Sequence, residues 1–116
     1  MKQINVLLLS SLFLITSCSQ KDSYQADKKD KVTLMTLDPG HFHAALVQKS
    51  RHEYINDSVF VYGPKGADVD DHLQRIANFN NRAENPTNWK EIVYEGDDYL
   101  EKMIAEKSGN VMMVSG

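Results

Sequence analysis

The sequence has little that could cross-link the chain or attract a polyanion. Its 116 residues include one cysteine, Cys18, so no disulfide framework can form within the chain. The 13 lysines and arginines are outnumbered by 16 acidic residues, which gives a net charge of −3. No basic stripe is interleaved with aromatic residues, and we therefore expect no nucleic-acid partner.

Long apolar runs are also lacking. The stretch 6–15 (VLLLSSLFLI) is broken by serines, whereas crossing the hydrocarbon core takes about 20 apolar residues. Behind Lys2, such a stretch is typical of a secretory signal. It ends in Leu14-Ile15-Thr16-Ser17-Cys18, which resembles the lipobox of bacterial lipoproteins. The resemblance implies a signal peptide over 1–17, a lipid on the Cys18 thiol, and attachment to a membrane of the cell envelope, facing the periplasm or the outside.

The part that follows the cysteine divides into two regions. Residues 19–31 contain no aliphatic side chain larger than alanine and cannot bury enough apolar surface to offset the entropy lost on ordering. We therefore predict a flexible tether over 18–31. Residues 32–116 then form one small domain.

Strand-like and helix-like patterns alternate within this domain. Short apolar runs at 32–37, 59–62, 91–94 and 111–114 predict strands, and apolar residues at helical spacing predict helices over 42–51, 69–77 and 98–108. The order β-α-β-α-β-α-β favours an α/β fold, a Rossmann-like, partial doubly wound parallel sheet with helices on both faces. The run 111–114 is apolar throughout, as in strands buried on both faces, yet the sequence stops two residues later. We therefore expect a truncated fold, the first part of a longer protein.

The turn after the first predicted strand, residues 38–44 (DPGHFHA), lies where doubly wound folds bind the pyrophosphate of a dinucleotide. Together with the strand-helix-strand pattern over 92–114, the stretch 40–46 resembles the amino-terminal Rossmann domain of the glucose-fructose oxidoreductase, inositol dehydrogenase and rhizopine-catabolism (Gfo/Idh/MocA-like) family. The resemblance implies an oxidoreductase that transfers hydride between NAD or NADP and a carbohydrate or polyol. It implies cofactor contacts at Gly40, His41, Phe42 and His43. The family's substrate-proximal lysine would lie beyond Gly116, so the chain would not be catalytic alone.

The turn departs from the dinucleotide fingerprint G-x-G-x-x-G. Asp38 falls at the first glycine, Gly40 at the second and His43 at the third, so only Gly40 matches. We expect Asp38 to repel a pyrophosphate and the bulk of His43 to obstruct close packing of helix on strand. The second predicted strand also ends in Tyr62-Gly63 rather than in the acidic residue that would hold a ribose hydroxyl.

Two other functions fit the same turn. His41 and His43 could share a metal ion if the turn stays extended, as in metal-dependent hydrolases, with further ligands among His52, His72, Asp38, Asp70 and Asp71. Otherwise His52 and His72 are expected at the surface of charged helical stretches. The second is a non-catalytic ligand-binding lipoprotein that keeps the fold.

The stretch 78–89 (NFNNRAENPTNW) is rich in amides and carries the only tryptophan, Trp89. This composition could stack on a sugar ring and hydrogen-bond to it. It is also typical of a solvated loop whose aromatic side chain fixes it to the body of the domain.

Overall fold

The computed structural model describes residues 31–115. The predicted signal peptide (1–17), Cys18 and all but the last residue of the predicted tether (18–31) lie outside the described residues. Seven elements follow one another: β1 (Leu34–Leu37), the 3₁₀ helix η1 (Phe42–Lys49), β2 (Ser58–Gly63), α1 (Ala67–Asn81), β3 (Lys90–Glu95), α2 (Tyr99–Glu106) and β4 (Val111–Val114).

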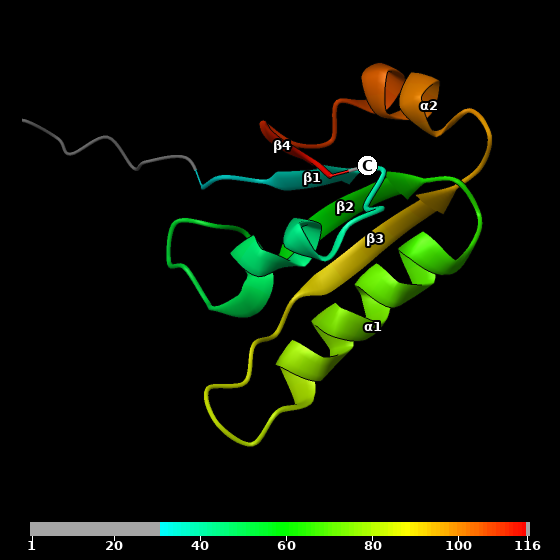
Figure 1. Ribbon diagram of the computed structural model, residues 1–116. Coiled ribbons are helices and arrows are strands. Elements are labelled where there is room, and N and C mark those ends of the chain that lie inside the picture. The colour runs from blue at the N-terminus through cyan, green and yellow to red at the C-terminus, as the bar shows by residue number, and fades with distance from the viewer. Residues whose placement is uncertain (1–30, 116) are drawn as a thin grey trace, which may run out of the picture.

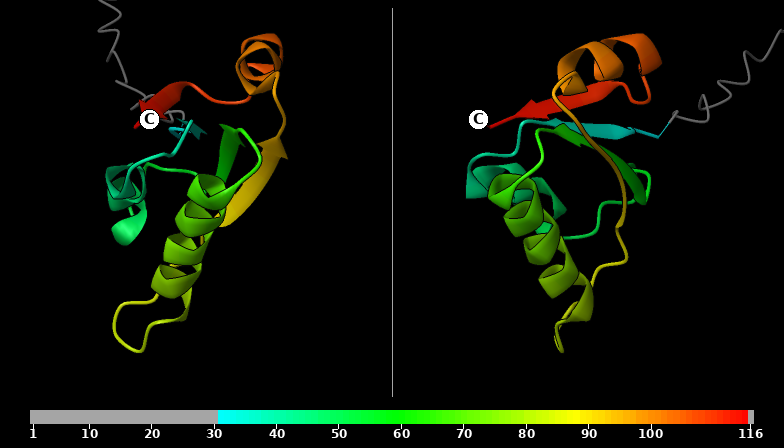
Figure 2. Two further views of the ribbon diagram at one scale, coloured as in Figure 1. Left: turned by 45° about the vertical axis from the view of Figure 1, so that its right-hand side comes forward. Right: turned by 90° about the vertical axis from the view of Figure 1, so that its right-hand side faces the viewer.

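The four strands form one parallel sheet in the order β3-β2-β1-β4. The chain moves outward from β1 through β2 to β3, and then crosses back to place β4 on the other side of β1. Helices η1 and α1 cover one face of the sheet, and α2 lies on the opposite face (Figures 1 and 2). The predicted fold class, a Rossmann-like α/β fold with a parallel sheet and helices on both faces, is confirmed.

The core lies between the sheet and the pair η1 and α1. Leu34 and Val59 from neighbouring strands pack with Ala45 of η1, Ile76 of α1 and Trp89, and none of these five side chains is more than 4% exposed. Alternate residues of β1 and β2 point to this face, because successive side chains of a strand lie on opposite sides of the sheet. The face on which η1 and α1 pack therefore contains the main hydrophobic core.

Two predicted helices differ in detail from the observed ones. The first is a 3₁₀ helix rather than an α-helix, and the second extends to Asn81, into the stretch that its polar residues predicted to be irregular. Two local interactions explain the extension. The side-chain amide of Asn81 donates to the carbonyl of Ala77, and Phe79 packs against the core, so polar composition alone was a poor guide to where the helix ends.

Strand β4 lies at the edge of the sheet within residues 31–115. The side chains of Val111, Met112 and Val114 are 42%, 46% and 61% exposed, although the unbroken apolar run predicts burial on both faces. No helix between residues 31 and 115 is both long enough and apolar enough to cross a bilayer.

Candidate nucleotide-binding turn

The carboxyl ends of β1 and β4 define the candidate site. The chain leaves β1 in one direction and β4 lies on its other side, so the connections diverge between these two strands, which is where doubly wound sheets bind ligands. Two hydrogen bonds hold the turn here. The Asp38 N–H donates to the Tyr62 carbonyl (2.9 Å), and the Ser115 hydroxyl donates to the His41 carbonyl (3.4 Å). The structure thus places the predicted turn at the switch point.

The backbone of the turn is left-handed at a position where the fingerprint has a glycine and this sequence has an aspartate. Asp38, at the position of the first fingerprint glycine, adopts a left-handed conformation with φ of 48°, which aspartate tolerates better than most residues. The Gly40 N–H donates to the Asp38 carbonyl (2.8 Å), which tightens the turn. Gly40, His41 and Phe42 are exposed, and the N–H groups of His41 and Phe42 have no acceptor among residues 31–115. These two N–H groups are available to a phosphate oxygen.

The prediction that His43 obstructs packing of the helix on the strand is wrong. His43 is exposed, and the small side chains of Ala44 and Ala45 face the sheet instead, at 4% and 1% exposure. His41 caps η1 by accepting the His43 N–H on its Nδ1 (3.4 Å). A small residue is therefore still present where helix and strand meet, one position later than the fingerprint expects.

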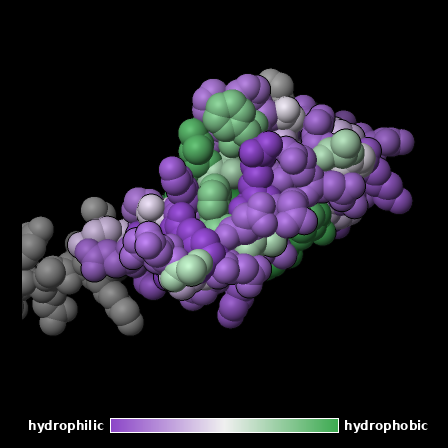
Figure 3. Space-filling view, turned by 60° about the horizontal axis from the view of Figure 1, so that its bottom comes forward, coloured by the Kyte–Doolittle hydropathy of each residue, from purple (hydrophilic) through white to green (hydrophobic). Residues whose placement is uncertain are grey.

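Three aromatic rings cluster on the outer side of the turn. The ring centroids of His41 and His43 lie 4.4 Å apart with nearly parallel planes, and Phe42 lies 4.5 Å and 4.1 Å from them. Phe42 is 48% exposed and Leu46, one turn further along η1, is 47% exposed. Apolar side chains reach the surface in small groups bordered by hydrophilic ones (Figure 3). Three rings packed on one another thus lie beside the N–H groups of His41 and Phe42.

The proposed metal site has only part of its geometry. His41 is extended (φ −130°, ψ 145°) and its ring lies close to that of His43, as a shared metal requires. Within residues 31–115, however, no three histidine, cysteine, aspartate or glutamate side chains come together to hold an ion. Asp71 is paired with Arg75 (2.8 Å), and His52 is exposed in the segment after η1.

A narrow crevice of about 20 Å³ separates the turn from α1. It is lined by Pro39, Gly40, His41, Phe42, Asp68, Asp71, His72 and Arg75. His72 is only 3% exposed, so the prediction that it lies at the surface is wrong. Its position on α1 turns it toward the sheet, next to the buried residues Val69 and Ile76, and sequence spacing could have indicated this, because 69, 72 and 76 share one helical face.

Beneath the crevice, His72 meets a second buried titratable group. Its Nε2 lies 4.0 Å from Oε2 of Glu91 on β3, whose Oε1 accepts a 2.5 Å hydrogen bond from the side-chain amide of Gln48. Burial lowers the pKa of His72 to about 4 and raises the pKa of Glu91 to about 7. Because the imidazole is uncharged at neutral pH, the contact between them is not an ion pair there.

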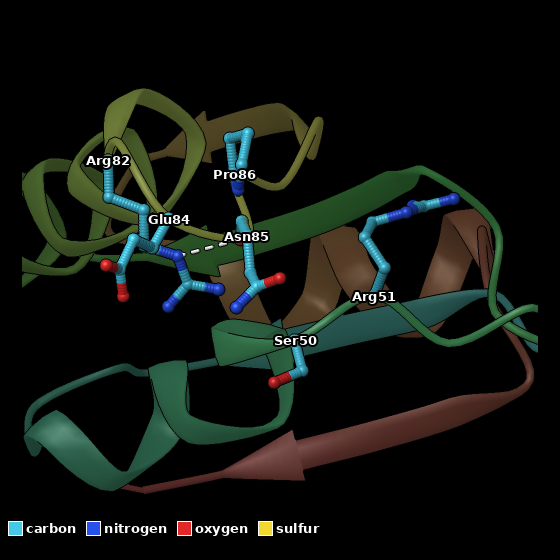
Figure 4. Close-up of a pocket in the computed structure, with 6 residues that line it drawn as sticks. All are labelled: Ser50, Arg51, Arg82, Glu84, Asn85 and Pro86. Atoms are coloured by element: carbon cyan, nitrogen blue, oxygen red, sulfur yellow. Dashed lines mark hydrogen bonds between the residues drawn. The ribbon is translucent and has the colours of Figure 1, made fainter.

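A larger hollow, of about 670 Å³, lies at the opposite end of the domain. It is lined by Ser50, Arg51, Arg82, Glu84, Asn85 and Pro86. In Figure 4, Arg51 points away from the other lining residues, while Arg82 is bonded to Asn85. The Arg82 guanidinium is already occupied by the carbonyls of Asn85 (2.8 Å) and Lys49 (2.6 Å). The hollow lies at the amino ends of the strands, away from the switch point, and its cations serve the fold.

The amide-rich stretch 78–89 is fixed to the domain. Trp89 is 4% exposed and its indole N–H donates to the Gln48 carbonyl (2.6 Å). The Asn80 side chain donates to the Trp89 carbonyl and accepts from the Trp89 N–H and the Thr87 hydroxyl. Trp89 therefore pins the loop to the body of the domain and cannot stack on a sugar.

Comparison with known proteins supports this description of the fold. A crystal structure of a protein from Parabacteroides merdae ATCC 43184, provisionally named an oxidoreductase, matches with a TM-score of 0.74 and 65% sequence identity. The match covers 76% of the present chain and 20% of that chain, so the chain spans about a fifth of the protein it matches. No family model and no curated protein matches the sequence. The match supports a general relation to oxidoreductases, while membership of the Gfo/Idh/MocA-like family stays a prediction.

Proposed function

We propose that the chain is the amino-terminal, nucleotide-binding part of an oxidoreductase, with NAD or NADP bound at the turn from Gly40 to His43. The observation that carries the proposal is the position of this turn at the switch point of a parallel sheet, with two N–H groups that have no acceptor within the described part of the chain. The oxidoreductase name of the matched crystal structure supports the reaction class. A bound nicotinamide would supply a hydride acceptor or donor, and the chain's own contribution is to hold and orient the phosphates.

The residues of the turn fit a phosphate-bearing ligand with one exception. The N–H groups of His41 and Phe42 can donate to phosphate oxygens, and the absence of a side chain at Gly40 leaves the backbone open to them. Asp38 opposes binding, because its carboxylate lies at the same turn and carries the same charge as the ligand. We therefore expect the affinity for nucleotide to be lower than in proteins with a complete fingerprint.

Isothermal titration calorimetry of the full chain with NAD⁺ and with NADP⁺ tests this proposal. A valine at position 40 (Gly40→Val) places a side chain where the phosphate must approach and should abolish binding. Asp38→Gly removes the repelling charge and suits the left-handed backbone, and should tighten binding about tenfold, an amount that corresponds to about 1.4 kcal/mol. His52→Val, an exposed change at the other end of the domain, serves as the matched control. Unchanged binding in a folded Gly40→Val protein would contradict the proposal, and no binding by the unaltered chain would favour a non-catalytic lipoprotein.

The proposal also covers the substrate of the oxidoreductase and the location of the protein in the cell. Resemblance to the sugar and polyol oxidoreductases supports a carbohydrate-like substrate, and the lipobox-like segment before Cys18 supports a lipid-anchored protein of the cell envelope. Metabolic labelling with a radioactive fatty acid tests the anchor. Labelled protein in the membrane fraction that becomes unlabelled in Cys18→Ser is the expected result, and label retained by Cys18→Ser would exclude this cysteine as the attachment point.

A further inference from the structure

Three buried polar side chains from three elements meet beneath the candidate turn. Gln48 of η1 is 0% exposed, His72 of α1 is 3% exposed, and the Glu91 side chain of β3 is 10% exposed. One hydrogen bond joins Gln48 to Glu91, and three further polar atoms, Gln48 Oε1, His72 Nε2 and Glu91 Oε2, are buried without a partner. Leaving such atoms unpaired costs about 1–3 kcal/mol each, so the arrangement calls for an occupant that donates hydrogen bonds.

The chemistry of these atoms identifies the occupant. An amide oxygen and a carboxylate oxygen are acceptors, and the Nε2 of a neutral imidazole is a third when the ring proton is on Nδ1, which is the tautomer that we assign to His72. Acceptors cannot satisfy one another, whereas a proton on Glu91 Oε2 turns that atom into a donor. The 4.0 Å between Nε2 and Oε2 is too long for a direct hydrogen bond and suits one water molecule between them.

We propose that Gln48, His72 and Glu91 form a buried site that binds one proton and a bridging water, and that this site holds η1 and α1 together beneath the ligand-binding turn. Both helices flank the crevice at the turn, and the Gln48 carbonyl is tied in addition to the indole of Trp89. Losing the proton leaves Glu91 with the Gln48 amide as donor to Oε1, while Oε2 carries negative charge opposite the unprotonated Nε2 of His72. The position of η1, and with it that of the turn, therefore depends on the proton.

We assign the proton to the Glu91–His72 pair and not to the other charged groups near His72. The charged or titratable groups that line the crevice around His72 are His41 of the turn and Asp68, Asp71 and Arg75 of α1. Arg75 and Asp71 are paired with each other and act on His72 in opposite directions. Glu91 is the titratable group that approaches His72 from the sheet.

The direction of the pH dependence follows from burial. Glu91 has a raised pKa in the folded chain, so its contribution to stability is present at low pH and is lost as the pH rises toward about 7. His72 has a lowered pKa, so its contribution is present above about 6.5 and is lost as the pH falls toward about 4. Between about pH 4.5 and 6.5 the two dependences have opposite signs and largely cancel, so the net stability should fall below about pH 4.5 and again above about pH 6.5.

The test measures urea unfolding of the full chain from pH 4 to pH 9, without nucleotide. Glu91→Gln keeps the shape but cannot ionise, and it should remove the loss of stability near pH 7. His72→Gln should remove the loss on the acidic side, and Glu101→Gln, an exposed change of the same chemistry, should leave both. Hydrogen exchange of the bonded amides of His43 and Ala44, corrected for its intrinsic pH dependence, should accelerate above pH 7 in the unaltered chain and not in Glu91→Gln.

Carbon NMR of the Glu91 carboxyl in the unaltered chain keeps the proposal testable if a variant fails to fold. A midpoint near 7 is expected, and a midpoint near the ordinary 4.5 of a glutamate would overturn the proposal, as would an unchanged pH profile in a folded Glu91→Gln. None of these measurements involves a nucleotide. A chain that binds no NAD or NADP but keeps the pH profile would therefore contradict the proposed function alone.

Discussion

The two faces of the sheet differ in how completely they are covered. On the face of η1 and α1, alternate strand residues such as Leu34, Val59 and Val61 are at most 2% exposed. On the face of α2, Ile92, Met112 and Val114 are 48%, 46% and 61% exposed. The same sheet thus has one face that is fully covered over its central strands, β1 and β2, and one face that a single eight-residue helix covers in part. Stability and the candidate site both depend mainly on the first.

The open face still has one well-packed region. Tyr62 is 1% exposed, and its hydroxyl bonds to Glu106 of α2 (2.7 Å) and to Ser108 (2.9 Å). Burial raises the pKa of Tyr62 above its ordinary value. Beside it lies a hollow of about 380 Å³, lined in part by Phe60, Ile92 and Lys102. Tyr62 therefore connects α2 to the sheet, although α2 leaves the outer strands on this face uncovered.

The largest contrast between the faces should appear when one large apolar side chain is removed from each. Trp89→Ala on the covered face should lower the free energy of unfolding by about 4 kcal/mol, because it leaves a cavity and an unpaired Gln48 carbonyl. Ile104→Ala on α2, where the side chain is 55% exposed, should cost less than about 1 kcal/mol. Urea unfolding of both variants measures the difference. Equal losses would show that the open face is covered in solution.

A second test concerns the approach of β4 to the sheet. A Cβ added at Gly109 would lie 2.5 Å from the backbone oxygen of Thr33 and 2.7 Å from Cγ of Met35. Because one of these neighbours is backbone, Gly109→Ala should destabilise the chain by about 1–3 kcal/mol. Thermal unfolding against an exposed control, Glu101→Ala, checks the value. A loss no larger than that of the control would mean that β4 is loosely held.

The smallest expected difference is in the loss of stability when either of two tyrosines on the open face is changed to phenylalanine. Tyr62→Phe removes a buried hydroxyl with two partners and should cost about 1 kcal/mol. Tyr94→Phe removes an exposed bond to Asp98 and should cost less than half of that. Chemical unfolding at pH 6 compares the two. If Tyr94→Phe is the more harmful, the hydroxyl of Tyr62 does not anchor α2.

The site shows where reading the sequence succeeded and where it did not. The place of residues 38–44 between a strand and a helix predicts a turn at one edge of the sheet, because parallel sheets present such turns there. The left-handed backbone of Asp38 was not recognisable, since the fingerprint leads one to look for glycine there. The helical face shared with Val69 and Ile76 placed His72 inward, but its charged neighbours suggested the opposite.

The sequence by itself determined the order of strands and helices and the fold class, because period-2 and period-3.6 apolar patterns depend on local geometry. Tertiary structure alone decided which residues came together. Gln48, His72 and Glu91 are 24 and 19 residues apart along the chain, and no local pattern links them. Their meeting depends on two helices crossing the same face of the sheet. The same reason explains β4, whose apolar run predicts burial on both faces but does not specify a neighbour, and which lies at the sheet edge within residues 31–115.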